Sequence, residues 1–208
     1  KRANNLGMPV AIHAIGDRGV KMALNSFEYS NNISLANRIE HVEIIEPNDV
    51  ERFKRLKVTA SMQPNHGTGV IGKYITPRVG EEREQFAYIW NGFLKSGVRL
   101  ALSSDFATSP FSPLIQLADA VFRESPSGLY DGPWYPEQAL SFDDALYAYT
   151  QIGAELSGWG DQIGSITVGK YADFVILDQT LSSPVGRELK STKVAKTYFA
   201  GQLVFPKN

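Results

Sequence analysis

Cysteine is absent from this chain of 208 residues. Disulfide bonds and thiolate metal sites are therefore excluded, and any metal ion would have to bind to histidine, aspartate or glutamate side chains. Histidine is itself scarce, with three residues in the whole chain. The position of each histidine is therefore informative.

Long apolar runs and an excess of one charge are also missing. No stretch approaches the roughly 18 consecutive apolar residues of a membrane-spanning helix, and no signal segment opens the chain. The 21 Lys and Arg residues nearly balance the 22 Asp and Glu residues, which leaves no electrostatic basis for binding nucleic acid or an anionic membrane. We therefore expect a globular, cytoplasmic protein with a small-molecule substrate and no nucleic-acid or membrane partner. Because the chain begins at Lys1 rather than at Met, we also expect its natural N-terminus to be missing.

Four strand-helix units follow one another in the first part of the chain. Short apolar runs predict strands at residues 8–14, 38–45, 58–62 and 98–103. Helical spacing of apolar residues predicts helices at residues 18–29, 47–56, 86–94 and 114–122. The intervening residues 63–83 are polar and are expected to form a long functional loop. Consecutive units of this kind imply parallel strands joined by right-handed crossovers.

The pattern changes after Ser125. A connector rich in Pro and Gly, residues 126–136, precedes a helix that is predicted at residues 145–156 and begins with a capping box at Ser141. The tail is predicted to be β-rich, with a hairpin turn at Gly201 and Gln202 and with strands at residues 162–168, 173–177, 194–199 and 203–205. We expect one domain at residues 1–158 and a second at residues 159–208.

Two architectures fit four such units, namely half of an eight-stranded barrel or a small doubly wound sheet. Functional side chains of a barrel lie at the C-terminal ends of its strands. The strand-like runs at residues 10–13, 39–41 and 100–104 lead to His13, His41 and Asp105 respectively, which favours the half barrel.

These three residues allow two interpretations. A histidine at a strand end often serves only as a hydrogen-bonded residue, and an Asp after a strand often caps a helix or forms a turn. Taken together, two imidazoles and a carboxylate form a suitable set of ligands for a divalent metal ion, with positions left for water. From the residues alone, both interpretations stay open.

A second motif points elsewhere. Gly164 to Lys170 fits most of a phosphate-binding loop, but Tyr171 stands where Ser or Thr is required. Such a loop opens a helix, whereas this stretch leads into a predicted strand. We interpret it as a β-turn.

Five motifs occur in the order seen in the amidohydrolase superfamily: HAIGDR at residues 13–18, RIEH at 38–41, SMQPNH at 61–66, SSD at 103–105 and GSITVGKYADFVILD at 164–178. In particular, the chain resembles the amidohydrolase 3 branch, which includes N-substituted formamide deformylases. The resemblance covers essentially the whole chain. It implies an α/β fold that consists of the C-terminal half of a (β/α)8 TIM-like barrel, strands five to eight, followed by part of a small β-sandwich.

The resemblance also implies a metal centre. His13, His41 and Asp105 would bind a divalent ion, expected to be zinc, with one or two ions in the full protein. Asp105 would also be catalytic, by taking a proton from the metal-activated water and passing it to the leaving amine during hydrolysis of a non-peptide carbon-nitrogen bond. The family's remaining ligands would lie before Lys1. We therefore expect the chain alone to be inactive, and to self-associate or require the missing N-terminal half.

Further residues are implied as substrate contacts, each with a structural alternative. His66 is a candidate substrate or oxyanion contact, or else an exposed loop residue. Asp17 and Arg18 would pair near the mouth of the site, unless Asp17 caps the following helix. Arg83 and Trp90 occupy positions beside the pocket in relatives, although Trp90 could equally be a core residue.

Two other functions remain possible. One is a non-catalytic regulatory or binding protein on the same scaffold, since a fold does not guarantee chemistry; the presence or absence of an HxH motif upstream would distinguish it from an enzyme. The other is a small nucleotide-binding domain, which would bind phosphate at Lys170.

Overall fold

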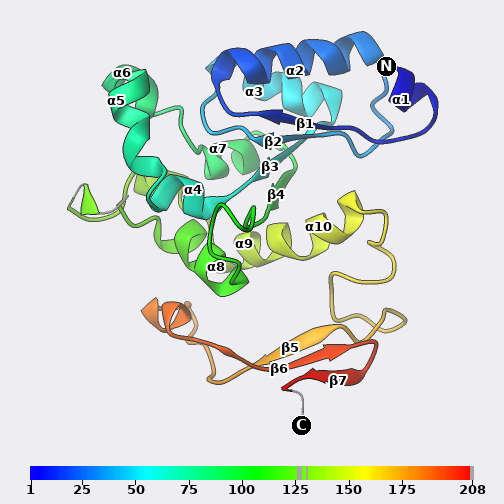
Figure 1. Ribbon diagram of the computed structural model, residues 1–208, viewed down its shortest axis with the longest axis vertical. Helices are drawn as coiled ribbons and strands as arrows, with labels where there is room; N and C mark the ends of the chain where they lie inside the picture. The colour runs from blue at the N-terminus through cyan, green and yellow to red at the C-terminus, as the bar shows by residue number, and fades with distance from the viewer. Residues whose placement is uncertain (126–127, 130, 207–208) are drawn as a thin grey trace.

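The computed structural model describes residues 1–125, 128–129 and 131–206. It contains a four-stranded sheet with its helices and a separate three-stranded sheet near the C-terminus (Figure 1). Pro126, which belongs to the expected connector, lies outside the described residues. Within the described part of the chain, no helix is both long and apolar enough to cross a membrane.

The first sheet consists of four parallel strands in chain order: β1 (Ala11–Ala14), β2 (Arg38–His41), β3 (Thr59–Met62) and β4 (Leu100–Leu102). This confirms the predicted series of parallel strand-helix units. Ala14 pairs with His41, and Met62 pairs with Leu102, so the C-terminal ends of neighbouring strands lie side by side. All residues of β3 and β4 are buried, as expected of strands covered on both faces.

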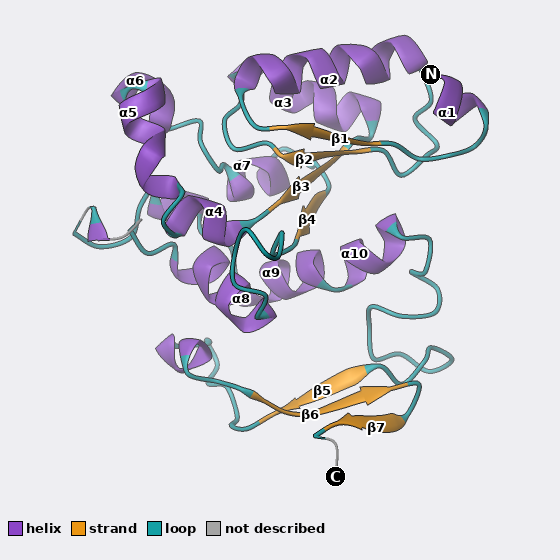
Figure 2. Cartoon of the chain, viewed as in Figure 1, coloured by secondary structure: helices purple, strands orange, loops and turns teal. Residues whose placement is uncertain are grey.

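Helices cover this sheet on the two sides that Figure 2 shows, with α2 and α3 near β1 and with α8, α9 and α10 beyond β4. A short α1 (Arg2–Asn5) precedes β1. Helix α2 (Asp17–Ser30) buries one apolar stripe at helical spacing: Val20, Ala23, Leu24 and Phe27. Pro47 occupies the first turn of α3 (Pro47–Leu56), as predicted.

The expectation of a long loop at residues 63–83 is wrong. The segment is mostly helical and contains α4 (Pro64–Thr68), the 3-10 helix η1 (Gly72–Tyr74), α5 (Ile75–Val79) and α6 (Glu81–Glu84). None of these pieces exceeds five residues, so none has enough turns to show an apolar period. Gly80 separates α5 from α6 with a φ of 80°, a conformation that glycine adopts easily.

The predicted helix at residues 86–94 begins later, as α7 (Trp90–Lys95). Before it, Ala87 forms an antiparallel bridge with Ile44. The backbone N–H of Tyr88 also donates to the carbonyl of Glu43 at 2.9 Å. The predicted strand at 38–45 accordingly ends at His41, and its last residues pair with the chain before α7 instead of continuing the sheet.

The C-terminal helices are α8 (Pro113–Phe122), α9 (Phe142–Tyr149) and α10 (Gln151–Leu156), with a 3-10 helix η3 (Pro136–Gln138) in the connector. The prediction of a single helix at residues 145–156 is wrong, because Thr150 interrupts it with φ −113° and ψ −73°. The N-cap bond of the predicted capping box is present, since the Asp144 N–H donates to Ser141 Oγ at 3.1 Å.

The second sheet is antiparallel and contains β5 (Phe174–Leu177), β6 (Val194–Phe199) and β7 (Gln202–Phe205), with the 3-10 helix η4 (Arg187–Lys190) between the first two. The predicted strand at residues 162–168 is wrong. Its apolar residues Ile166 and Val168 are fully exposed and the segment consists of turns. The hairpin turn lies one residue earlier than predicted, at Ala200 and Gly201, which both have positive φ.

Lys170 of the phosphate-loop motif has a structural role. Its ammonium group donates to Gln151 Oε1 at 3.2 Å and to the carbonyls of Gly160 at 2.6 Å and Ile163 at 3.1 Å. An ammonium has three N–H groups, so all are used, and no helix follows the motif. The nucleotide-binding alternative therefore has no structural support.

A buried arginine joins the connector to the core. The Arg123 guanidinium is completely buried and donates to the carbonyls of Trp134 at 2.6 Å, Tyr88 at 2.9 Å and Ala87 at 3.4 Å. Its carbon Cζ lies 4.3 Å from the centre of the Trp90 ring, within the range of a cation–π interaction. This one side chain therefore links the segment before α7 to the segment after α8.

We predict that Arg123→Met lowers the free energy of unfolding by on the order of 3 kcal/mol or more, because the carbonyls of Trp134 and Ala87 lose this donor and a buried carbonyl without a donor costs about 1–3 kcal/mol. The Tyr88 carbonyl keeps the N–H of Trp90 as a donor. Urea denaturation followed by circular dichroism measures the change. Arg187→Met is the matched control, because the Arg187 side chain is 73% exposed in an ion pair with Glu124 and should contribute about 1 kcal/mol at most. Equal losses in the two variants would contradict the prediction.

Candidate metal centre

The polar residues at the C-terminal ends of the four parallel strands converge. His13 lies one residue before the end of β1, and His41 is the last residue of β2. Gln63 follows β3 directly, and Asp105 stands three residues after the end of β4. Since the strands are parallel and in register, all four residues lie at the same end of the sheet, where the strands have their C-terminal ends.

His13 and His41 are neighbours. Their ring centres lie 4.5 Å apart with an angle of 70° between the ring planes. His41 Nδ1 lies 2.9 Å from Gln63 Oε1, while Gln63 Nε2 donates to Ser103 Oγ at 2.9 Å. The amide oxygen can only accept a hydrogen bond, so Nδ1 of His41 carries the proton and Nε2 keeps a free lone pair.

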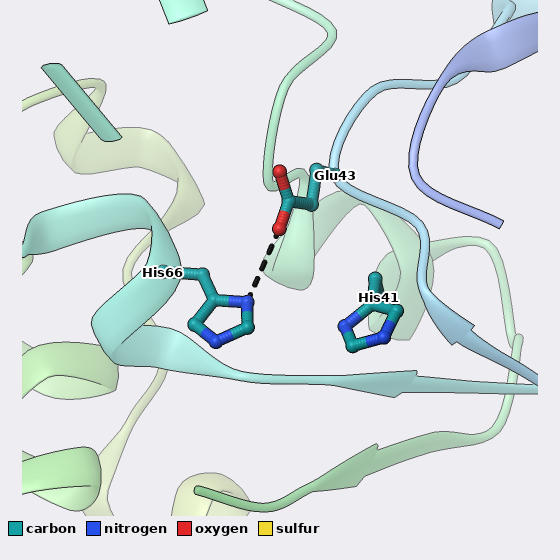
Figure 3. A group of neighbouring side chains, drawn as sticks. All are labelled: His41, Glu43 and His66. Atoms are coloured by element: carbon teal, nitrogen blue, oxygen red, sulfur yellow. Dashed lines mark hydrogen bonds and ion pairs between the residues drawn. The ribbon is translucent and has the colours of Figure 1, made fainter. Parts of the chain in front are cut away.

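His66 lies close to both His41 and Asp105. It lies on α4, is 3% exposed, and its ring centre is 5.7 Å from that of His41. Its Nδ1 lies 3.1 Å from Glu43 Oε1, and its Nε2 lies 3.7 Å from Asp105 Oδ2. Figure 3 shows Glu43 and His66 joined by this hydrogen bond, with His41 beside them. The alternative that His66 is an exposed loop residue is therefore wrong.

Glu43 is a functional candidate that sequence reasoning missed. It is 6% exposed, and it belongs with His41 and His66 to a group whose potential ligand atoms all lie within 4.8 Å of one another. Burial raises the pKa of the nearby Tyr88 well above its ordinary value, and the Glu43 carboxylate adds to this effect. The sequence contained one signal, because Glu43 is a carboxylate inside an otherwise apolar run that ends at Ile45.

The backbone at these strand ends has unusual dihedral angles. His41, Val42 and Asp105 have φ values of 78°, 49° and 52°, in the left-handed region that residues other than glycine rarely adopt. Such conformations cost on the order of 1–3 kcal/mol each and cluster at functional sites. At His41 and Asp105 they turn the chain out of the sheet at the residues that form the cluster.

The donor set of this cluster fits a divalent metal ion. Imidazole nitrogens and carboxylate oxygens are the ligands that zinc and similar ions bind in proteins without cysteine. One of these atoms, His66 Nε2, is buried and makes no hydrogen bond within the described part of the chain, which marks a position for a bound group.

The other predicted contacts have the following positions. Asp17 begins α2 and forms an ion pair with Arg83 of α6, so α6 is tied to the end of the sheet where the cluster lies. Asp17 Oδ1 also accepts a hydrogen bond from the Arg18 N–H at 2.7 Å, and Arg18 is exposed. Trp90 is completely buried against Arg123, which matches its alternative interpretation as a core residue.

Comparison with known proteins identifies relatives over nearly the whole chain. The amidohydrolase 3 model, described as "Amidohydrolase family", matches residues 1–205. The chain is 34% identical to "Protein LONG AFTER FAR-RED 3" of Arabidopsis thaliana over 98% of its length and 35% of that protein. It is 32% identical to "N-substituted formamide deformylase" of Arthrobacter pascens, which covers 97% of the chain and 37% of that protein. The chain thus spans little more than a third of the length of these curated relatives.

Solved structures show the same relationship. An uncharacterized metal-dependent hydrolase from Pyrococcus furiosus superposes with a TM-score of 0.68 and 35% sequence identity, over 82% of this chain and 33% of that one. A second from Pyrococcus horikoshii also has a TM-score of 0.68, with 36% identity over 79% of this chain and 32% of that one. The mixed α/β fold and the family resemblance predicted from the motifs are confirmed. The chain belongs to the amidohydrolase family, in the amidohydrolase 3 branch.

Proposed function

We propose that the chain is the C-terminal part of a metal-dependent hydrolase that cleaves amide-type, non-peptide carbon-nitrogen bonds. The observation that carries this proposal is the cluster of His13, His41, His66 and Asp105 at one edge of the parallel sheet. In this proposal, β1 to β4 are the fifth to eighth strands of a barrel, and β5 to β7 are part of a small β-sandwich that begins at residue 159. A relative that is named as a formamide deformylase supports the class of bond.

We assign His13, His41 and Asp105 as ligands of a divalent ion, with zinc as the expected metal. The free Nε2 lone pair of His41 follows from its hydrogen bond to Gln63. When bound, such an ion supplies Lewis acidity and lowers the pKa of a coordinated water. In a family with this donor set, hydrolysis by attack of water is the reaction that these groups serve.

The protein groups then move protons and hold the substrate. Asp105 accepts a proton from the attacking water and returns it to the leaving nitrogen, so that the amine departs in neutral form. It is half-exposed, with 39% of its side chain accessible, and can therefore reach both water and substrate. His66 lies beside it. We assign the Asp17–Arg83 ion pair and Arg18 as further substrate contacts near the same strand ends.

The first test is metal binding. We expect the chain to bind zinc, and we expect His41→Ala and Asp105→Asn each to raise the Kd by about 10-fold or more, because each removes a ligand. Competition with a chromophoric chelator measures the Kd. Asp143→Asn, at an exposed carboxylate on α9, is the matched control and should leave the Kd unchanged. Equal affinity in Asp105→Asn and Asp143→Asn would contradict the assignment.

The second test is catalysis in the complete protein to which we assign this chain. With N-substituted formamides as substrates, Asp105→Asn should lower kcat by about 10²- to 10⁴-fold, the usual contribution of a general acid–base group. Asp143→Asn again serves as the control. A complete protein that retains zinc but hydrolyses no such amide would favour the regulatory or binding alternative.

The chain alone is proposed to be inactive and to associate. In the first sheet β1 and β4 each have one strand neighbour among the described residues, and such edges are open to pairing with another chain. An open cleft of about 1320 Å³ also separates α9 from the second sheet, lined by Leu146, Phe174, Tyr198 and Val204 among others. Apolar surface of this kind is the usual mark of an interaction site.

We therefore predict that the purified chain sediments as a dimer or a larger species, and that its apparent mass falls as the protein is diluted. Sedimentation velocity over a hundredfold range of concentration measures this. A single monomeric boundary at every concentration would contradict it.

A further inference from the structure

The imidazole of His66 has one nitrogen that its surroundings leave unexplained. Nε2 is buried, and it makes no hydrogen bond to any described residue. Asp105 Oδ2 lies 3.7 Å from it. A buried polar atom without a partner costs about 1–3 kcal/mol, so this position calls for a group that binds there.

The tautomer of His66 shows what kind of group this is. Glu43 Oε1 lies 3.1 Å from Nδ1, and a carboxylate is a hydrogen-bond acceptor only. Nδ1 therefore carries a proton, and in the neutral ring Nε2 directs its lone pair into the site. Nε2 and the Asp105 carboxylate are both electron-rich and face each other, an arrangement that a cation between them would stabilise.

The separation of the two atoms agrees with a shared cation. Zinc binds nitrogen and carboxylate oxygen at about 2.0–2.2 Å in a tetrahedral arrangement, which places two ligand atoms roughly 3.4 Å apart. The observed 3.7 Å is close to this value. Direct hydrogen bonding is the weaker explanation, because 3.7 Å exceeds the normal range for such a bond.

The ring nitrogens of His66 and His41 have the same pattern of hydrogen bonding. In each ring Nδ1 is held by a protein oxygen, Gln63 Oε1 for His41 and Glu43 Oε1 for His66. The other ring nitrogen accepts no hydrogen bond given by a described residue in His66, and in His41 it is the nitrogen that keeps the lone pair. Histidines that bind metal ions commonly donate their second N–H to a carboxylate or amide in this manner, which fixes the tautomer and the orientation of the ring.

We propose that His66 is an additional ligand of the metal centre, binding the ion through Nε2 beside Asp105, and that Glu43 is the buried carboxylate that orients it. This inference rests on the proposed function, because it takes the metal centre as given. The ion would then be bound by a residue of helix α4 in addition to the three residues at the strand ends. Glu43 acts through His66 and is a positioning residue rather than a ligand.

Nitrogen NMR of the unaltered chain tests the assignment directly. The 15N-labelled protein has three histidines, and single His→Gln variants identify their signals in long-range 1H–15N spectra. We expect zinc to shift Nε2 of His66 while its Nδ1 stays protonated. Shifts confined to His13 and His41 would overturn this inference alone. Loss of the proton from His66 Nδ1 on zinc binding would also overturn it, since the ion would then lie between Glu43 and His66.

A chain in which no histidine responds and no zinc binds would instead overturn the metal centre itself, and with it the proposed function. The two failures are therefore distinguishable in one titration. The zinc-induced shifts are read in the unaltered protein, and the variants serve only to assign the signals.

Variants supply a second measurement. His66→Gln should raise the zinc Kd by about 100-fold or more, and Glu43→Gln by about 10- to 100-fold, the usual effect of removing an orienting partner. Thr68→Val is the matched control, because Thr68 is a buried polar residue on the same helix whose Oγ1 bonds to the Pro64 carbonyl. It should leave the Kd within about twofold. If His66→Gln, folded by circular dichroism, binds zinc as tightly as the control, the assignment is wrong.

Discussion

Parallel pairing in register is the constraint on which the rest of the structure depends. Because Ala14 pairs with His41 and Met62 with Leu102, four strands that are far apart in the sequence end at the same edge of one sheet. The polar residues at those ends meet without any need for long loops to bring them together. The buried lengths of β3 and β4 supply the apolar packing that holds this edge rigid.

The cluster at these strand ends combines several features, each of which lowers the stability of the fold. The Glu43 carboxylate is buried, one imidazole nitrogen of His66 has no hydrogen-bond partner among the described residues, and His41 and Asp105 have positive φ values. Each costs free energy that the apolar core has to offset. Their occurrence in one place, with complementary hydrogen-bonding directions, is the pattern expected where a protein maintains a binding site at the expense of stability.

The strand ends could be predicted from the sequence because each follows a short apolar run, and His13, His41 and Asp105 were identified in this way. Glu43 was not identified, because it lies within residues 38–45, which were predicted as one continuous strand. Only the positive φ of His41 and Val42, which no residue pattern reveals, ends the strand there. Residues 63–83 escaped prediction for a different reason. Their helices are too short for periodicity, and tertiary contacts, such as the hydrogen bond from Asn65 to Asp119, hold them in place.

The bonds of Lys170 bear on how the two sheets are joined. Residues 157–173 contain neither helix nor strand, and a segment of that kind usually behaves as a flexible tether. Here the Lys170 ammonium group donates to the side chain of Gln151 and to the carbonyls of Gly160 and Ile163. The segment therefore folds back on the N-terminal end of α10. The hydrogen bonds of Lys170 therefore restrict bending of this segment. A force applied to the C-terminal sheet would therefore pass through α10 to the strand beside it, β4, whose far end leads to Asp105.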